Sequence, residues 1–341
     1  MADRYWVGGN GVWNSTNTTN WSATSGGAGG ASVPTSLDNV YINTSSGPVN
    51  LEITTATGYT PVCYTFTMSR GTLAPGIVFN APFVIGDVSG GANSGNFSIT
   101  AGTVVYFEPI RIQGSTTGTP STVFLPNANS IIGNFEIASG SVQLNSNFSV
   151  NSGGIFVKSG ATLDVSGRTV TATDVEVESS GTLTTSSSTF TTSFWTLHSG
   201  AVVNSSGISI LTVNSVFSDL GPTSRTYPSV AFPSSPTVDV PASVTFTAFA
   251  LSGMRVKAGQ TIYVGTLTNP STSVRTLSTS NSPGQFTLSS PSGTKTLSFL
   301  NISNCNATGG ATWVAPTSSV DSGNNTGIQF ANSQGFLAFF G

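Results

Sequence analysis

A repeat of about 20 residues in the middle of the chain restricts its fold more than any other feature. Ser-Gly pairs occur at residues 139–140, 159–160, 180–181 and 199–200, so that successive glycines are 20, 21 and 19 residues apart. Apolar and polar residues alternate on both sides of each pair. This period suits one coil of a parallel β-solenoid, in which each coil pairs with the next at about 4.8 Å.

The alternation predicts which side chains point into such a solenoid. Residues at the same place in successive repeats should stack into apolar columns, because strands in neighbouring coils lie in register. One predicted column contains Phe135, Ile155, Val175 and Trp195, and a second contains Ile137, Val157, Val177 and Leu197. A third column, of Lys158, Glu178 and His198, should point outward as a ladder of solvated ion pairs.

The composition supports an all-β fold and excludes several classes of protein. Ser, Thr, Gly and Asn make up about half of the 341 residues, 37% are hydrophobic and only 7% are charged. Helix-forming residues are scarce, whereas Thr, Val, Ile and Phe are frequent. A net charge of −3 with ten Lys and Arg argues against nucleic-acid binding. No run of about 18 apolar residues occurs, so we expect no membrane span. Antiparallel sandwiches or jelly rolls are the alternative fold.

Four segments with different compositions predict the organisation of the chain. Residues 1–45 are rich in Trp and Gly and predict an N-terminal cap or attachment module. Residues 46–210 contain the repeat and predict the β-solenoid. Five prolines within residues 211–243 predict a linker, because proline at this density interrupts a stack of coils. Residues 244–341 predict a C-terminal β domain, either sandwich-like or a continuation of the solenoid.

Two segments resemble parts of known proteins. Residues 5–13 read Y-W-V-G-G-N-G-V-W, and residues 309–313 and 321–327 read G-G-A-T-W and D-S-G-N-N-T-G. The first is similar to an N-terminal module of tailed-bacteriophage virion proteins, especially of marine phages, and of some bacterial surface proteins. The second resembles the closing segment of the same family, although Ile328 stands where a Trp is expected. The resemblance implies a β-helical structural protein displayed outside a particle or cell, and no single activity.

The tryptophans of these two segments are the candidate binding residues. An open solenoid end exposes apolar core and unpaired strand edges. We therefore expect Trp6, Trp13 and Trp21 to cover the first coil and Trp313 to cover the last strands, as cap or attachment residues. A sugar-stacking platform is the alternative role for this cluster.

The residues that catalysis would require are few. The chain has one His and thirteen carboxylates, and Glu176 with Glu178 is the carboxylate pair that best fits glycoside cleavage. Because Glu178 also belongs to the outward ladder, we expect no catalytic residues, and no metal or cofactor. Cys63 and Cys305 match no metal or redox spacing, so we expect two buried thiols, with a disulfide as the alternative.

Together these observations predict a non-enzymatic virion protein on the phage exterior, as head decoration, knob or short fibre. The first residues lack the apolar segment of a secretory signal, which favours synthesis in the host cytoplasm and assembly into the virion. The expected partners are other capsid or tail proteins. A host surface glycan as ligand and a homotrimer remain open. The alternatives are a receptor-binding or depolymerising tailspike and a bacterial adhesin fragment.

Overall fold

The computed structural model is almost entirely β and forms two compact units. It describes residues 1–48, 51–69, 77–86, 95–99, 105–107, 110–113, 120–124, 130–240, 243–280 and 284–331. Unit 1 comprises Met1–Phe190 and Gly200–Asn204, and unit 2 comprises Thr191–Ser199 and Ser205–Gly341. Among the described residues, no helix has the length and apolarity needed to cross a membrane. The only helical segments there are the short 3-10 turns η1 (Thr44–Ser46) and η2 (Ser205–Gly207).

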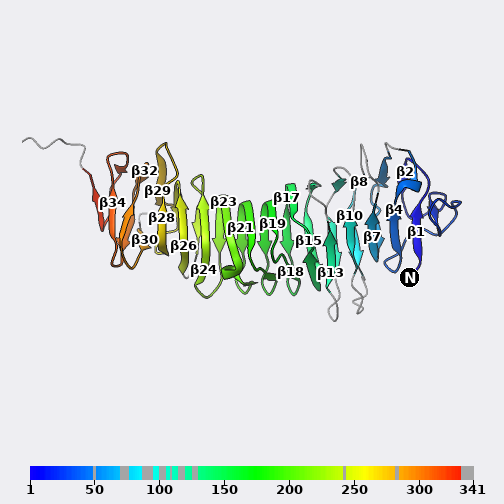
Figure 1. Ribbon diagram of the computed structural model, residues 1–341, viewed down its shortest axis with the longest axis horizontal. Helices are drawn as coiled ribbons and strands as arrows, with labels where there is room; N and C mark the ends of the chain where they lie inside the picture. The colour runs from blue at the N-terminus through cyan, green and yellow to red at the C-terminus, as the bar shows by residue number, and fades with distance from the viewer. Residues whose placement is uncertain are drawn as a thin grey trace, which may run out of the picture. The chain divides into compact units, whose positions relative to one another are not determined.

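Unit 1 is a parallel β-solenoid built from three ladders of short strands (Figure 1). Ladder A contains β1 (Asp3–Trp6), β4 (Asn39–Ile42), β7 (Thr65–Met68), β10 (Phe97–Ile99), β13 (Ser121–Phe124), β16 (Ser141–Leu144), β18 (Thr162–Asp164), β20 (Thr182–Thr184) and β22 (Val202–Val203). Ladder B contains β2 (Gly11–Trp13), β5 (Ile53–Thr55), β8 (Ile77–Phe79), β11 (Val105–Phe107) and β14 (Ser130–Ile132). Ladder C contains β6 (Val62–Cys63), β9 (Phe83–Gly86), β12 (Ile110–Gln113) and β15 (Phe135–Ser139). The long strands β17 (Phe148–Val157) and β19 (Thr169–Val177) pair with each other in both ladders B and C.

The predicted inward columns are confirmed in unit 1. In ladder C, Ile137 pairs with Val157, and Val157 pairs with Val177. All three side chains are completely buried. Phe135, Ile155 and Val175 align in the same way and are buried beside them. Each such side chain contributes about 1.5–3 kcal/mol of apolar burial, so the stacked columns form the core of the unit. Trp195 and Leu197 are also buried, within β21 (Ser188–Leu197) in its unit 2 part.

The Ser-Gly pairs form the corners of the coils, as their spacing suggests. Gly160 and Gly200 have φ angles of +75° and +89°, a left-handed conformation that glycine adopts without a Cβ clash. In the pair between them the left-handed residue is Ser180, with φ of +61°, and Gly181 is not left-handed. The extra residue of the 21-residue repeat therefore moves the corner onto serine, at a cost in strain that glycine would avoid.

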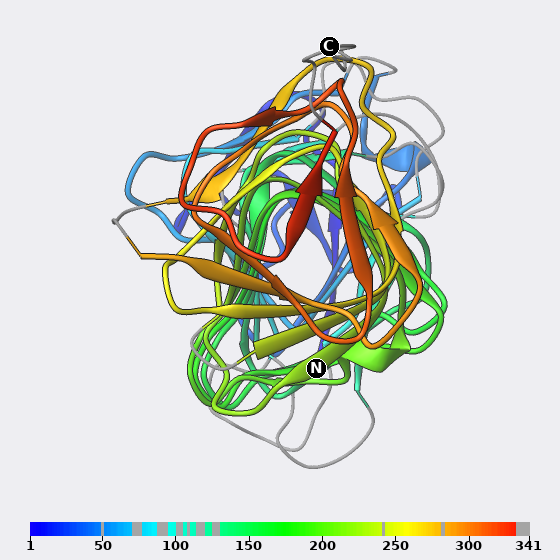
Figure 2. The ribbon, with the colours of Figure 1, turned by 90° about the vertical axis from the view of Figure 1, so that its left-hand side faces the viewer.

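Unit 2 also consists of three parallel ladders, which surround its interior in the end-on view of Figure 2. The first contains β24 (Arg225–Phe232), β26 (Ser243–Leu251), β28 (Thr261–Thr268), β30 (Phe286–Ser289) and β33 (Cys305–Thr308). The second contains β25 (Thr237–Asp239), β27 (Met254–Val256), β29 (Arg275–Thr279), β32 (Leu300–Ile302) and β35 (Val320–Asp321). The third contains β31 (Thr294–Thr296), β34 (Thr312–Ala315) and β36 (Ile328–Phe330). Strand β23 (Ile208–Asp219) pairs with both β24 and β25.

The segment expected to be a proline-rich linker instead contains solenoid strands. Within residues 211–243 lie the end of β23, all of β24 and all of β25, each in parallel register with its neighbours. The prolines do not interrupt this pairing because of where they lie. Pro222, Pro233 and Pro236 are between strands, and Pro228 falls at the one residue of β24 that the β24–β26 register skips. The C-terminal part, residues 244–331, continues as solenoid ladders of the same unit and not as a sandwich.

A buried ion pair lies in the interior of unit 2 where β23 ends. Arg225 Nη1 and Tyr227 Oη both bind the carboxylate of Asp219, the tyrosine at 2.9 Å. Burial, and next the charge of Asp219, hold the pKa of Tyr227 well above its ordinary value. Both cysteines are likewise buried and unpaired, Cys63 in β6 and Cys305 in β33, as expected.

Candidate functional site

The three N-terminal tryptophans pack together inside the first coil of unit 1. Trp6 on β1 and Trp21 on β3 (Trp21–Ser22) meet edge to face with ring centroids 5.1 Å apart, and Trp13 on β2 lies 4.9 Å from Trp21. Strand β3 runs antiparallel to β1 and so covers the outer edge of ladder A. Trp13 also contacts Phe83 of ladder C at 5.7 Å. The segment thus continues the solenoid core and adds a lid strand at its N-terminal end.

Burial decides what these rings can contact. Trp6, Trp13 and Trp21 are at most 1% exposed, and so is Trp313 on β34 of unit 2. The Trp6 indole donates a hydrogen bond to Gly9 O at 2.7 Å, and the Trp313 indole donates one to Thr308 O at 3.0 Å. A ring enclosed on both faces has no surface for a sugar or a partner protein to stack on. In this arrangement the four residues have the geometry of core packing.

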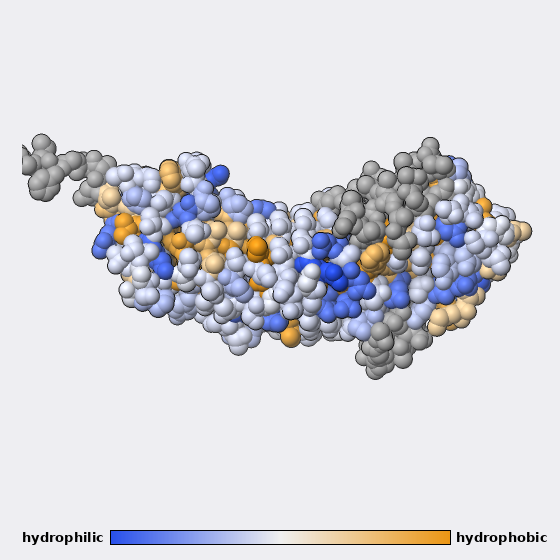
Figure 3. Space-filling view, in the orientation of Figure 1, coloured by the Kyte–Doolittle hydropathy of each residue, from blue (hydrophilic) through white to orange (hydrophobic). Residues whose placement is uncertain are grey.

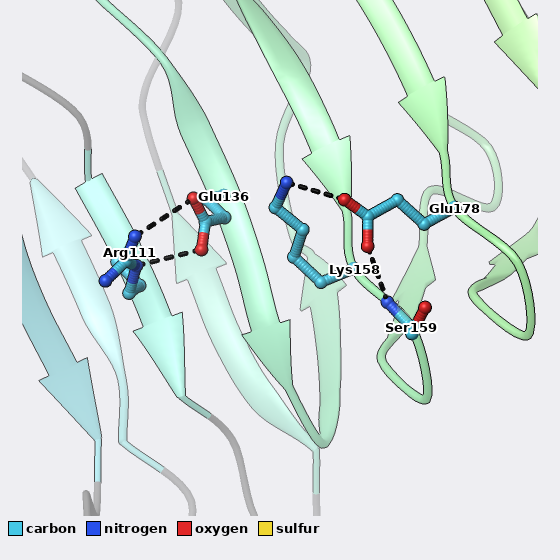
Figure 4. A network of polar contacts seen from close by, with 5 residues as sticks. All are labelled: Arg111, Glu136, Lys158, Ser159 and Glu178. Atoms are coloured by element: carbon cyan, nitrogen blue, oxygen red, sulfur yellow. Dashed lines mark hydrogen bonds and ion pairs between the residues drawn. The ribbon is translucent and has the colours of Figure 1, made fainter.

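Charged side chains gather instead on the outer face of ladder C. Two of the ten basic and four of the thirteen acidic residues lie there, namely Arg111, Glu136, Lys158, Asp174, Glu176 and Glu178. We call these six residues the charged face. Figure 4 shows four of them, Arg111, Glu136, Lys158 and Glu178. One column contains Arg111, Glu136, Phe156 and Glu176 on successive coils. Arg111 Nε contacts Glu136 Oε1 at 2.8 Å.

Lys158 and Glu178 form the second ion pair of the charged face. Lys158 Nζ lies 2.7 Å from Glu178 Oε1, and the Ser159 backbone N–H donates to Glu178 Oε2 at 3.2 Å. The ammonium group also lies 5.6 Å from the centre of the Phe156 ring. The hydrogen bond to Glu178, followed by the charges of Glu178, Glu136 and Glu176, raises the pKa of Lys158. Both side chains of the pair are about one-third exposed, so the pair contributes at most about 1 kcal/mol.

Lys158 and Glu178, the first two members of the predicted outward ladder, form an ion pair between neighbouring coils. His198 follows β21 and belongs to unit 2. Glu178 accepts from Lys158 Nζ and from the Ser159 N–H, so its carboxylate links two neighbouring coils. Glu176 lies two residues away on the same face of β19.

Asp174 is the most perturbed carboxylate of the charged face. It lies opposite Gly154 on the neighbouring coil, and its Oδ1 atom is buried with no hydrogen-bond partner among the described residues. Burial, and next the charge of Glu176, raise the pKa of Asp174 to about 6. Asp174 therefore releases its proton at a higher pH than an ordinary aspartate.

The sequence did not predict Arg111, Glu136 or Asp174 as part of this face. Arg111 and Glu136 are 25 residues apart, not 20, because the coils before the regular repeat differ in length. Asp174 could have been found from the repeat, since it follows Gly154 by 20 residues, and a glycine beside a carboxylate on neighbouring coils marks a close approach.

Within the described ranges, no three His, Cys, Asp or Glu side chains lie close enough to hold a metal ion. The face drawn in Figure 3 is largely pale, in the middle of the hydropathy scale, with separate blue hydrophilic and orange hydrophobic patches. Searches against protein-family models, curated proteins and solved structures found no match to this chain.

Proposed function

We propose that this protein is a non-enzymatic structural component of a tailed-phage particle, displayed on its exterior as head decoration, knob or short fibre. The observation that carries the proposal is that the candidate residues are used for scaffolding. The four tryptophans are core side chains, and Lys158 with Glu178 is an ion pair between coils. The resemblance of residues 5–13 to a virion module supports the location.

The composition of the exterior also supports a role outside a cell. A chain rich in Ser, Thr and Asn with few charged residues has a small net charge, −3 at pH 7, and its surface interactions change little with ionic strength. The partners in this proposal are other capsid or tail proteins, and synthesis takes place in the host cytoplasm.

Localisation on particles is the direct test. Purified virions would be labelled with an antibody against the recombinant chain and imaged, with particles lacking this chain as the control. We expect label on the head or tail exterior at regular positions. Absence of the chain from purified virions would refute the proposal.

One observation favours a second candidate function, a tailspike that cleaves polysaccharide. Asp174 and Glu176 are two residues apart on one strand, which places them about 7 Å from each other, and glycosidases use two carboxyl groups at about 5–9.5 Å. A carboxyl group that remains protonated to about pH 6 has the property of a general acid.

Incubation with purified host capsule and lipopolysaccharide separates the two functions. The proposal predicts that the size distribution of both polymers stays unchanged. Depolymerisation that is abolished by Asp174→Asn or by Glu176→Gln, and retained by Glu52→Gln, would replace the structural role with the tailspike.

A further inference from the structure

The only Asn-Gly pair of the sequence, Asn10-Gly11, lies where β2 begins. In such a pair the backbone nitrogen of the second residue can attack the side-chain amide carbon of the first and close a five-membered ring. Glycine permits this attack most readily, because it has no Cβ to hinder the approach. The Asn10 side chain is also exposed to water. The pair therefore has the composition and the exposure of a deamidation site.

The backbone of Glu52, on the next coil of ladder B, holds both reacting groups. The Glu52 N–H donates to Asn10 Oδ1 at 2.9 Å, and the Gly11 N–H donates to Glu52 O at 3.0 Å. The first bond favours the attack, because it stabilises negative charge that develops on Oδ1. The second bond opposes it, because the Gly11 nitrogen must lose its proton before it can attack.

The leaving group is less restrained than the attacking group. Among the residues that the structure describes, none forms a hydrogen bond with Asn10 Nδ2. Gly11, in contrast, pairs with Ile53 as the first residue of the β2–β5 ladder. The step that limits the reaction is therefore the release of Gly11 from β5, which is a local opening of the first coil.

We propose that Asn10 is a site of spontaneous deamidation, and that the reaction occurs when β2 opens from β5. The Gly11 nitrogen forms a bond to Asn10 Cγ, and the bond from Cγ to Nδ2 breaks. Nδ2 leaves as ammonia with the proton that Gly11 gives up. Water then opens the cyclic imide at one of its two carbonyl carbons. Attack at Cγ gives aspartate, and attack at the backbone carbonyl gives isoaspartate, in which the chain runs through Cγ.

The two products should affect the first coil differently, because the backbone is held on both sides of Asn10. The Trp6 indole donates to Gly9 O at 2.7 Å, and Gly11 is bonded to Glu52 as described. Isoaspartate adds one carbon to the backbone between these two anchors and so has to break one of them. Aspartate adds no backbone atom, and its carboxylate can still accept the Glu52 N–H.

Isoaspartate should therefore loosen the N-terminal end of the solenoid permanently. Strand β2 carries Trp13, which packs against Trp21 of the lid strand β3. A shift of β2 moves Trp13 away from that ring and uncovers the edge of the core. Each opening of the first coil thus has a chance of becoming irreversible, wherever the protein is located.

The test is incubation of the full chain at mildly alkaline pH, with and without concentrated urea, followed by peptide mass spectrometry. We expect Asn10 to gain one mass unit before any other asparagine, and at least about tenfold more slowly in the folded chain than in urea. Asn14 is the internal comparison. It precedes Ser15, and its Oδ1 accepts from the N–H groups of Thr16 and Asn17, so it should react more slowly.

Three variants separate the reaction from its consequence. Asn10→Gln should stop the conversion, because its ring closure needs a six-membered imide, and incubation should then leave its Tm unchanged. Asn14→Gln is the matched control and should age like the unmodified chain. Asn10→Asp should melt like the unmodified chain, whereas the isoaspartyl product, isolated by ion exchange, should melt at a lower temperature.

Three results would overturn the proposal. One is conversion of Asn10 that is no faster than that of Asn14. The second is an equal rate in the folded chain and in urea, which would show that opening of β2 does not control the reaction. The third is an isoaspartyl product with the Tm of the unmodified chain.

Discussion

Asp174→Asn should stabilise unit 1, and only above about pH 5. The substitution keeps the shape of a side chain whose Oδ1 atom is buried without a partner, and it removes a negative charge that lies beside Glu176. Most substitutions at a partly buried position destabilise a protein. The opposite sign is expected here because the native carboxylate is held in an environment that disfavours its charge.

The magnitude follows from the pKa. Burial and Glu176 raise the pKa of Asp174 from 3.8 to about 6, and two pKa units correspond to about 3 kcal/mol. Since Asp174 is only half buried, screening by solvent reduces this energy. We therefore expect Asp174→Asn to raise the free energy of unfolding by about 1–2 kcal/mol at pH 7. The folded state binds the proton more tightly than the unfolded state. The stability that the protonated Asp174 contributes is therefore complete below about pH 4 and is lost as the pH rises through 6.

Thermal melts of the unmodified chain and the variant at pH 4, 5, 6, 7 and 8 provide the assay. The difference in Tm should be near zero at pH 4 and reach about 3–6 °C at pH 7 and above. Glu52→Gln, which alters an exposed carboxylate of the same unit, should change the Tm at pH 7 by less than Asp174→Asn does. A variant that is destabilised at pH 7, or whose Tm difference is constant from pH 4 to 8, would refute the reasoning.

Three further substitutions and one deletion test the packing. Val177→Asp should lower the free energy of unfolding in urea by about 4 kcal/mol or more, because it places an unpaired charge in a fully buried column. Glu176→Ser on the outer face should lower it by about 1 kcal/mol or less. Equal losses of stability would contradict the inward and outward assignment. Asp219→Asn should cost about 3–5 kcal/mol by leaving Arg225 buried without its partner, and an unchanged midpoint would show that the pair is dispensable. Deletion of residues 1–45 should make the protein aggregate, as measured by light scattering, because it removes the lid strand β3 and exposes the next coil. A monodisperse product with the Tm of the full chain would show that the segment is not a cap.

The regular part of the solenoid could be predicted because its coils have equal length. Where the period stays near 20, a residue and its neighbour on the next coil are the same distance apart in the sequence, as for Val157 and Val177. The column of inward residues, the outward position of Lys158 and its pairing with Glu178 all follow from that constancy.

The candidate sites outside the repeat could not be predicted because loop lengths differ from coil to coil. Glu52 lies 42 residues after its partner Asn10, and Tyr41 lies 36 residues after its neighbour Tyr5. Without a constant spacing, no periodicity in the sequence shows that these residues are neighbours. The proline-rich segment could not be predicted for a related reason. Its composition indicates turns, but it does not show that strands such as β24 lie between them.

The two cysteines make it possible to follow the opening of each unit separately. Cys63 is buried in unit 1 and Cys305 in unit 2, and desolvation raises the pKa of both thiols. A thiol in this state reacts with an alkylating reagent only when its surroundings open. The rate of alkylation at each cysteine, resolved by peptide mass, therefore reports the free energy of opening of its own unit in the unmodified chain. Two natural side chains thus provide a probe of whether unit 1 and unit 2 unfold together or one before the other.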